Sequence, residues 1–110
     1  MEPMPKPGAK ALARFEEIAQ QLAGRGVVAA KMFGMPSLKA GGKAFAGVFG
    51  EAFVFKLPEP ALGEALGLKG AVLFDPSGTG RAMKEWVVVP PAHAKRWPEL
   101  AERARKYVAG

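Results

Sequence analysis

The sequence predicts an α+β domain, a two-layer sandwich in which helices cover one face of a mainly antiparallel, five-stranded sheet. Two observations carry this prediction. Apolar residues recur at helical spacing near both ends of the chain, and short apolar runs separated by glycines and prolines fill the middle. The links between these runs are of hairpin length, which favours antiparallel pairing. The expected order is α-β-β-β-α-β-β-α, in a single domain spanning residues 10–110 behind a flexible arm at residues 1–9.

The first helix is expected over residues 10–23. Its apolar residues recur every three or four positions, which places them on one side of a helix; they are Ala11, Leu12, Phe15, Ile18, Ala19 and Leu22. Gly24 and Gly26 follow and favour a helix end. We expect the apolar stripe of this helix to pack on the sheet.

The glycine-punctuated middle of the chain is predicted to form the first strands. A run at residues 27–33 opens the sheet, and Leu38–Ala40 leads into Gly41-Gly42, a two-residue turn that tolerates the positive φ of a tight hairpin. Runs at residues 44–49 and 52–57 follow.

Both faces of the hairpin formed by these last two runs are predicted to be apolar. With a two-residue turn at Gly50-Glu51, side chains alternate strictly between the two faces of the hairpin. One face then carries Ala46, Val48, Phe53 and Phe55, and the other face carries Phe45, Phe49, Ala52 and Val54. A sheet with one solvated face does not need two apolar faces. Either this chain covers the second face, or another chain does, which makes a homodimer a hypothesis.

The second half of the chain predicts a short helix, two strands and a final helix. Pro58-Glu59-Pro60 opens the short helix, which runs to about Leu66, because proline suits a first helical turn. Strands are expected at residues 71–74 and 83–89. The final helix carries one apolar stripe, formed by Trp97, Leu100, Ala101, Ala104, Tyr107 and Val108.

The composition excludes several kinds of functional site. The chain has no cysteine and one histidine, so a thiolate zinc site, a disulfide scaffold, a cysteine nucleophile and a multi-histidine metal site are all ruled out. No apolar run has the length of a membrane span, and the first residues lack the apolar core of a signal peptide. The expected location is therefore the cytoplasm, with no membrane partner.

The net charge of +6 is distributed evenly along the 110 residues. Residues 1–55 carry seven basic and four acidic groups, and residues 56–110 carry nine and six, so each half has a net charge of +3. Such a charge favours a polyanionic partner through long-range attraction. A surface kept soluble by its charge explains the same count.

Two features were weighed as chemical sites. The loop at residues 75–81 (Asp-Pro-Ser-Gly-Thr-Gly-Arg) has the glycines and the arginine of an anion cradle, but it is also an ordinary connection built from turn residues. An imidazole is a common general base, yet a lone histidine near a helix start, such as His93, is usually a surface or capping residue. No spacing pairs the glutamates as acid and base. We therefore expect no catalytic residues, cofactor or metal, and a chain that is not an enzyme.

Basic residues alternate with aromatic residues along the predicted strands. Such a mixture can follow a nucleic-acid backbone and stack bases, and it also arises when aromatic residues face a core and lysines face water. The candidate interaction surface comprises Lys31, Phe33, Gly34, Lys43, Phe45, Lys56, Arg81, Lys84 and Trp86.

Five segments in order resemble the N-terminal domain of the TfoX/Sxy competence regulators. They are Lys31–Gly34, Gly42–Ala46, Lys56-Leu57, Phe74–Pro76 and Gly80–Trp86, with a Met-Phe-Gly and a Gly-Arg-x-Met element among them. The resemblance covers nearly the whole chain after the arm. It implies a two-layer fold of helix, three strands, helix, two strands and helix.

The resemblance also implies a function. Full-length members of the family regulate natural transformation together with a cyclic-AMP-responsive transcription factor, and they carry a second, C-terminal domain that this chain, ending at Gly110, is expected to lack. We therefore expect a stand-alone, non-enzymatic regulatory module with a protein partner, linked to transcription. Direct nucleic-acid binding and binding of a small anion are the alternatives.

Overall fold

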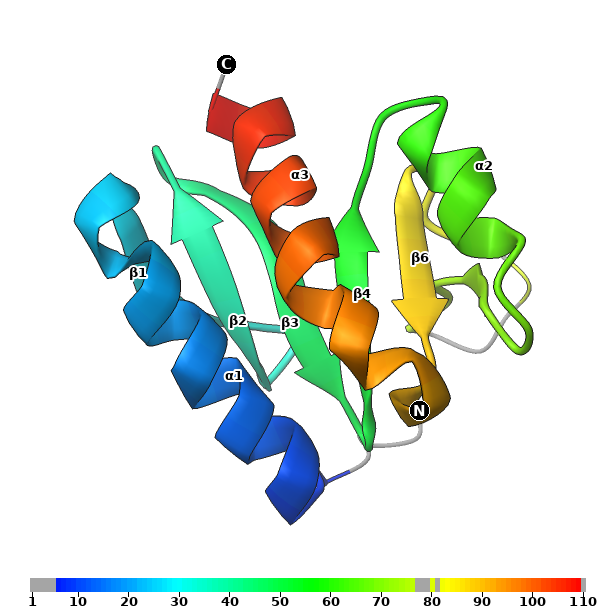
Figure 1. The fold of residues 1–110 in the computed structure, drawn as a ribbon, viewed down its shortest axis with the longest axis horizontal. Coiled ribbons are helices and arrows are strands. Elements are labelled where there is room, and N and C mark those ends of the chain that lie inside the picture. Colours follow the sequence, from blue (N-terminus) through cyan, green and yellow to red (C-terminus); the bar gives the residue numbers. More distant parts are fainter. Residues whose placement is uncertain (1–5, 77–79, 81, 110) are drawn as a thin grey trace.

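One antiparallel sheet of six strands, in the order β1-β2-β3-β4-β6-β5, forms the frame of the computed structural model, which describes residues 6–76, 80 and 82–109 (Figure 1). The strands are β1 (Val27–Met32), β2 (Met35–Ala40), β3 (Lys43–Phe49), β4 (Ala52–Lys56), β5 (Val72–Leu73) and β6 (Trp86–Val89). The helical elements are α1 (Ala9–Leu22), η1 (Ala23–Arg25), α2 (Ala61–Leu66), η2 (Pro91–Arg96) and α3 (Trp97–Ala109). The α+β class and the antiparallel sheet are as predicted.

The prediction of five strands was wrong, because β2 is a full strand. Met35–Ala40 pairs with β1 along its whole length and with β3 from Ser37 onward. The expected order passed over this strand, since Pro36 lacks an N–H and prolines are rare inside sheets. Pro36 is tolerated because it lies beyond the described pairing of β2 with β3. The described order is therefore helix, four strands, helix, two strands and helix.

The three α-helices lie on one face of the sheet and bury its main core (Figure 1). Aromatic rings form the centre of this core: Phe53 of β4 stacks on Trp97 of α3 at a centroid distance of 4.6 Å and approaches Phe15 of α1 at 6.4 Å. Phe53 has no exposed surface, and Trp97 is 1% exposed. A single strand residue thus contacts both long helices, and burial of rings this large is a main source of the stability of a small domain.

A β-bulge in β3 changes which side chains reach the helix-covered core. Leu38 pairs with Ala46 and Lys39 pairs with Ala44, so Phe45 is the extra residue between two consecutive pairs. Phe45 belongs to the helix-side core and is fully buried. Strict alternation predicted the opposite face for Phe45. That prediction was wrong, because a bulge inserts one residue and resets the alternation on one side of it.

The other face of the sheet, called the back face below, is covered at its centre by the chain itself. Phe74 and Met83, which flank the connection between β5 and β6, pack with Val54, Met35 and Trp86 in a second apolar cluster. The Phe74 ring lies edge-on to Phe49 at 5.1 Å. This accounts for the two apolar faces seen in the sequence, so the observation behind the homodimer hypothesis has an explanation within one chain. Self-association stays a prediction.

The remaining boundaries differ from the predicted ones by a few residues. α1 begins at Ala9, and the Gly8 N–H before it donates a 2.9 Å hydrogen bond to the Gly50 carbonyl oxygen. β6 begins at Trp86, because Lys84 and Glu85 form a turn instead of extending the strand. Within the predicted arm, residues 1–5 lie outside the described part of the chain.

Candidate functional site

The residues of the predicted interaction surface lie at two opposite ends of the sheet. Lys31 is near the end of β1, and Phe33 and Gly34 form its turn into β2. Lys43 and Lys56 lie at the other end, where β3 begins and β4 finishes, because neighbouring strands run in opposite directions. The predicted surface is therefore not one continuous patch.

Two aromatic residues of that set are buried. Phe45 has no exposed surface and Trp86 is 6% exposed, so Phe45 is not part of any surface and the Trp86 ring is almost wholly covered. Their inclusion was wrong for a physical reason: Phe45 lies in the bulge and Trp86 packs in the back-face cluster. Phe33, at 55% exposure, is open to solvent. Arg81 lies outside the described residues.

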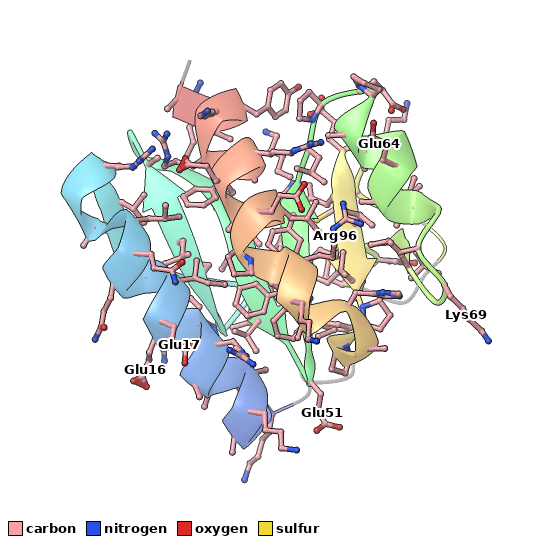
Figure 2. All side chains as sticks on the ribbon, viewed as in Figure 1. Glu16, Glu17, Glu51, Glu64, Lys69 and Arg96 are labelled. Atoms are coloured by element: carbon pink, nitrogen blue, oxygen red, sulfur yellow. The ribbon has the colours of Figure 1, made fainter. Side chains whose placement is uncertain are left out.

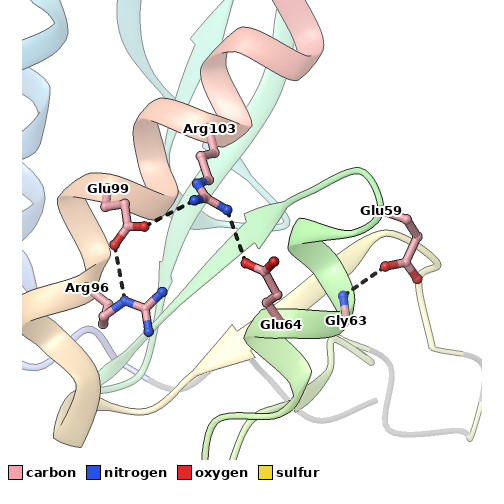
Figure 3. Close-up of polar contacts among 6 residues, drawn as sticks. All are labelled: Glu59, Gly63, Glu64, Arg96, Glu99 and Arg103. Carbon is pink, nitrogen blue, oxygen red and sulfur yellow. Dashed lines mark hydrogen bonds and ion pairs between the residues drawn. The ribbon is translucent and has the colours of Figure 1, made fainter.

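The arginines of the described chain are all engaged in ion pairs. Figure 3 shows three of these contacts, in which Arg96 and Arg103 bind Glu99 and Arg103 also reaches Glu64 of α2, at N–O distances from 3.1 to 3.5 Å. The other pairs are Arg14–Glu17, Arg25–Glu102 and Arg105–Glu102. Arg103–Glu64 joins α3 to α2 and Arg25–Glu102 joins η1 to α3, while the other pairs join residues three or four positions apart along the chain.

The lysines behave differently. The chain has ten, and within residues 6–76, 80 and 82–109 none of them is paired with an acid. Lys69, for example, extends away from the body of the protein after α2 (Figure 2). Since the arginines neutralise four glutamates and the lysines neutralise none, the excess positive charge is carried by lysine side chains that are free to meet a partner.

Four of these lysines line one end of the sheet and are called the basic edge: Lys39, Lys43, Lys56 and Lys84. Lys39 and Lys56 both lie on the back face, because side chains alternate along a strand and the neighbours of these lysines, Leu38 and Phe55, belong to the helix-side core. Lys43 begins β3, and Lys84 stands two residues before β6. With adjacent strands about 4.8 Å apart, β2 and β6 are separated by about 14 Å, so the basic edge is narrow. It lies at the top of Figure 1, where the arrows of β2 and β4 end.

An acid inside the basic edge is held by a tyrosine and not by a lysine. The Tyr107 hydroxyl, near the end of α3, donates a hydrogen bond to the Glu85 Oε2. This bond raises the pKa of Tyr107, with smaller contributions from desolvation and from the negative charge of Glu85. Glu85 has a φ of 75°, an uncommon value for a residue with a side chain. Glu85 therefore contacts Tyr107, and it forms no ion pair with Lys84 or Lys56.

The two chemical candidates of the sequence have ordinary structural contacts. In the 75–81 loop, the Gly80 N–H donates to the Asp75 Oδ2 at 2.8 Å, as in a turn, while residues 77–79 and 81 lie outside the described part. His93 donates through Nε2 to the Lys69 carbonyl oxygen at 2.9 Å, which joins η2 to the segment after α2.

The residues that the structure describes contain no group of three or more metal-ligating side chains. No helix among them has the length and apolar character needed to cross a membrane.

The candidate interaction surface predicted from the sequence contains three of the four lysines of the basic edge, Lys43, Lys56 and Lys84. It lacks Lys39, whose position across the sheet from Lys56 depends on strand pairing. The missing signal was the β2–β3 register, which a bulge shifts.

Comparison with known proteins adds no relative. No protein-family model matches the chain, and no curated protein or solved structure matches it.

Proposed function

We propose that this chain is a cytoplasmic, non-enzymatic regulatory module that binds an acidic protein surface through its basic edge. The proposal depends on a difference between the two basic residue types: every described arginine is in an ion pair, and the described lysines are in none. Charges left unpaired on one narrow edge steer a partner of opposite charge and fix its orientation.

A protein partner suits this edge better than a single-stranded nucleic acid does. Sequence-tolerant binding of single strands relies on aromatic rings on which bases stack. Three rings near the basic edge, those of Phe45, Phe55 and Trp86, are at most 6% exposed and are not available for stacking. The Tyr107 ring beside Glu85 is 38% exposed, and its hydroxyl is bound to that carboxylate. The half-buried apolar residues beside the lysines, Ala44, Met83 and Val88, instead fit the mixed apolar and polar composition of a protein interface.

The resemblance of five segments to the TfoX/Sxy N-terminal domain supports the regulatory part of the proposal. That family acts on transcription together with a protein partner. Three of the resembling segments, Gly42–Ala46, Lys56-Leu57 and Gly80–Trp86, contain lysines of the basic edge. The fourth strand before α2 is one more than the resemblance implies, so membership in this family is itself part of the proposal.

The test is capture of partners from a nuclease-treated native lysate by three forms of the immobilised chain. The first is the wild type. The second replaces the basic edge with glutamine (Lys39→Gln, Lys43→Gln, Lys56→Gln and Lys84→Gln). The third replaces four lysines elsewhere (Lys6→Gln, Lys31→Gln, Lys69→Gln and Lys95→Gln). Both variants lower the net charge from +6 to +2, so a difference between them reports position and not total charge.

We expect the basic-edge variant to lose its bound protein by about tenfold or more, the control variant to keep it, and added salt to weaken binding. Equal loss in both variants would show that only net charge matters and would contradict the proposal. A partner that is captured from an untreated lysate but not from the nuclease-treated one would also contradict the proposal.

Duplex nucleic acid is the second candidate, favoured by the four unpaired lysines on neighbouring strands. Contact with a phosphate backbone needs no exposed ring. Fluorescence anisotropy with labelled duplex DNA across a range of salt concentrations tests it. A plot of log K against log salt with a slope near −0.9 for each phosphate contacted would support this candidate, with a shallower slope for the basic-edge variant. A labelled poly-glutamate that binds when the duplex does not would exclude it in favour of a protein partner.

A further inference from the structure

A small cavity lies at the end of the sheet opposite the basic edge. Its volume is about 150 Å³, and its walls come from four elements: α1, the β3–β4 turn, η2 and the start of α3. Glu51, at the β3–β4 turn, lies between the start of α1 and the start of α3 (Figure 2). The cavity is partly open to solvent, and a volume of this size holds a molecule as large as benzene, so about six non-hydrogen atoms fit.

The floor of the cavity is apolar. Ala11, Pro91, Ala94 and Trp97 supply it. Ala11 is 2% exposed, and Trp97 is 1% exposed and stacked on Phe53, so these two residues of the floor belong to the main core. The hydrogen bond from the Gly8 N–H to the Gly50 oxygen holds the start of α1 against the β3–β4 turn. Two of the four walls are therefore joined directly by the backbone.

The rim of the cavity carries two cations and one carboxylate. Lys10 and Arg14 are four residues apart on α1, so they share a helix face. Arg14 also binds Glu17 through Nη1 at 3.1 Å, while Lys10 is in no ion pair within the described chain. Glu51 is likewise unpaired among the described residues, and its Cγ packs so close to Gly8 that a Cβ there would lie 2.9 Å away.

A buried donor beside the cavity has no partner. Trp97 is 1% exposed, and its Nε1–H has no acceptor among the described residues. The positive end of α1, which favours acids, has no acidic residue in its own first turn; the carboxylate beside it belongs to Glu51, whose Oε1 lies close to Gly8. An unsatisfied buried group is a local conflict of the kind expected at functional sites.

From these observations we propose that the cavity binds a small zwitterion of the α-amino acid class. The ligand carboxylate lies against Lys10 and Arg14, the ligand ammonium faces Glu51, and the ligand side chain rests on the apolar floor. A simple anion would satisfy the cations but leave Glu51 facing it, and a simple cation would meet Lys10 and Arg14. The site is independent of the basic edge and of the proposed function.

Tryptophan fluorescence tests the proposal, because Trp97 lines the cavity. The only other tryptophan, Trp86, lies in the back-face cluster, and a Trp86→Phe background leaves Trp97 as the sole reporter. The probes are L-alanine and L-valine, with propionate as the analogue that lacks the ammonium and ethylamine as the one that lacks the carboxylate. A thermal-shift series with the wild-type chain gives a second readout, since a ligand of the native state raises the melting temperature.

We expect saturable changes in Trp97 fluorescence and in the melting temperature with at least one of the two amino acids. We expect no such change with propionate or ethylamine at the same concentration. Lys10→Gln and Glu51→Gln should each weaken binding by about tenfold to a hundredfold, as for the loss of a charge-assisted hydrogen bond. Lys43→Gln, at the far end of the sheet, is the matched control and should leave binding unchanged. Propionate binding as tightly as alanine, or no saturable response to either amino acid, would overturn the proposal.

Discussion

The Tyr107 hydroxyl donates a hydrogen bond to the Glu85 carboxylate, which joins the last turn of α3 to the turn that begins β6. The two residues are 22 positions apart, and Glu85, which follows Lys84 of the basic edge, contacts a tyrosine and is in no ion pair with a lysine among the described residues. The bond also ties the end of α3 to the sheet at the side where the basic edge lies.

The first prediction concerns the titration of Tyr107. Glu85→Gln removes the negative charge and the carboxylate acceptor that raise the pKa of Tyr107, so the pKa should fall toward its ordinary value near 10. The chain has a single tyrosine, so a tyrosinate absorbance titration reports it alone. An unchanged titration curve in the variant would show that the hydrogen bond does not persist in solution.

A pH dependence of stability follows from the same contact. The folded chain holds the phenolic proton more tightly than the unfolded chain does. The contribution to stability is therefore complete below a pH of about 10 and is lost as the pH rises above it. In urea unfolding, the wild type should lose stability relative to Tyr107→Phe between neutral pH and strongly alkaline pH. If the free energies of unfolding of the wild type and of Tyr107→Phe changed in parallel with pH, this prediction would be contradicted.

The second prediction concerns the aromatic centre of the core. Phe53→Ala should lower the free energy of unfolding by about 3–5 kcal/mol, because it opens a cavity beneath Trp97 and Phe15. Phe33→Ala is the matched control: the same deletion at a ring that is 55% exposed should change stability by about 0.5 kcal/mol or less. Urea denaturation measures both. Similar losses at the two positions would mean that Phe53 is not central to the core.

The third prediction concerns a buried hydroxyl. Ser37 has no exposed surface, and its Oγ has no hydrogen-bond partner among the described residues. Ser37→Ala removes this unsatisfied group and should raise the free energy of unfolding by about 1 kcal/mol. Most buried substitutions destabilise, so the sign is the informative part. A lower urea midpoint for the variant would show that the hydroxyl does have a partner in solution.

The fourth prediction compares two glycines. A Cβ on Gly47 would lie 3.0 Å from the Pro36 carbonyl oxygen, a backbone atom that cannot move aside easily. Gly47→Ala should therefore destabilise the fold by more than about 1 kcal/mol. Gly24 has nothing within 4 Å of the same position, and Gly24→Ala should be neutral or stabilising by up to about 1 kcal/mol. Thermal unfolding of the pair tests this, and equal melting temperatures would contradict it.

The long helices and the general class of the fold were predictable because their signals are local. α1 and α3 bury stripes that the spacing of apolar residues already reveals, and the Gly41-Gly42 turn has the chemistry of a tight hairpin. β2 was missed because Pro36 argues against a strand, and its tolerance depends on where pairing with β3 begins. The β2–β3 register depends on the tertiary structure and cannot be read from the local sequence pattern.

The candidate sites were harder to predict, because each is assembled from distant segments. The basic edge brings Lys39 beside Lys56 only through the strand order, and the cavity combines Lys10, Glu51 and Trp97, which stand far apart in the chain. The pairing of arginines and the freedom of lysines are also invisible in a charge count, since both carry the same formal charge.

The bulge at Phe45 has a consequence for how related chains are to be recognised. A homologous strand without the extra residue would have to be aligned to β3 with a one-residue gap inside the strand, where gaps are normally penalised. Aligned without the gap, the residues on one side of Phe45 would be matched to positions of opposite solvent exposure, and a true kinship would score as a mismatch.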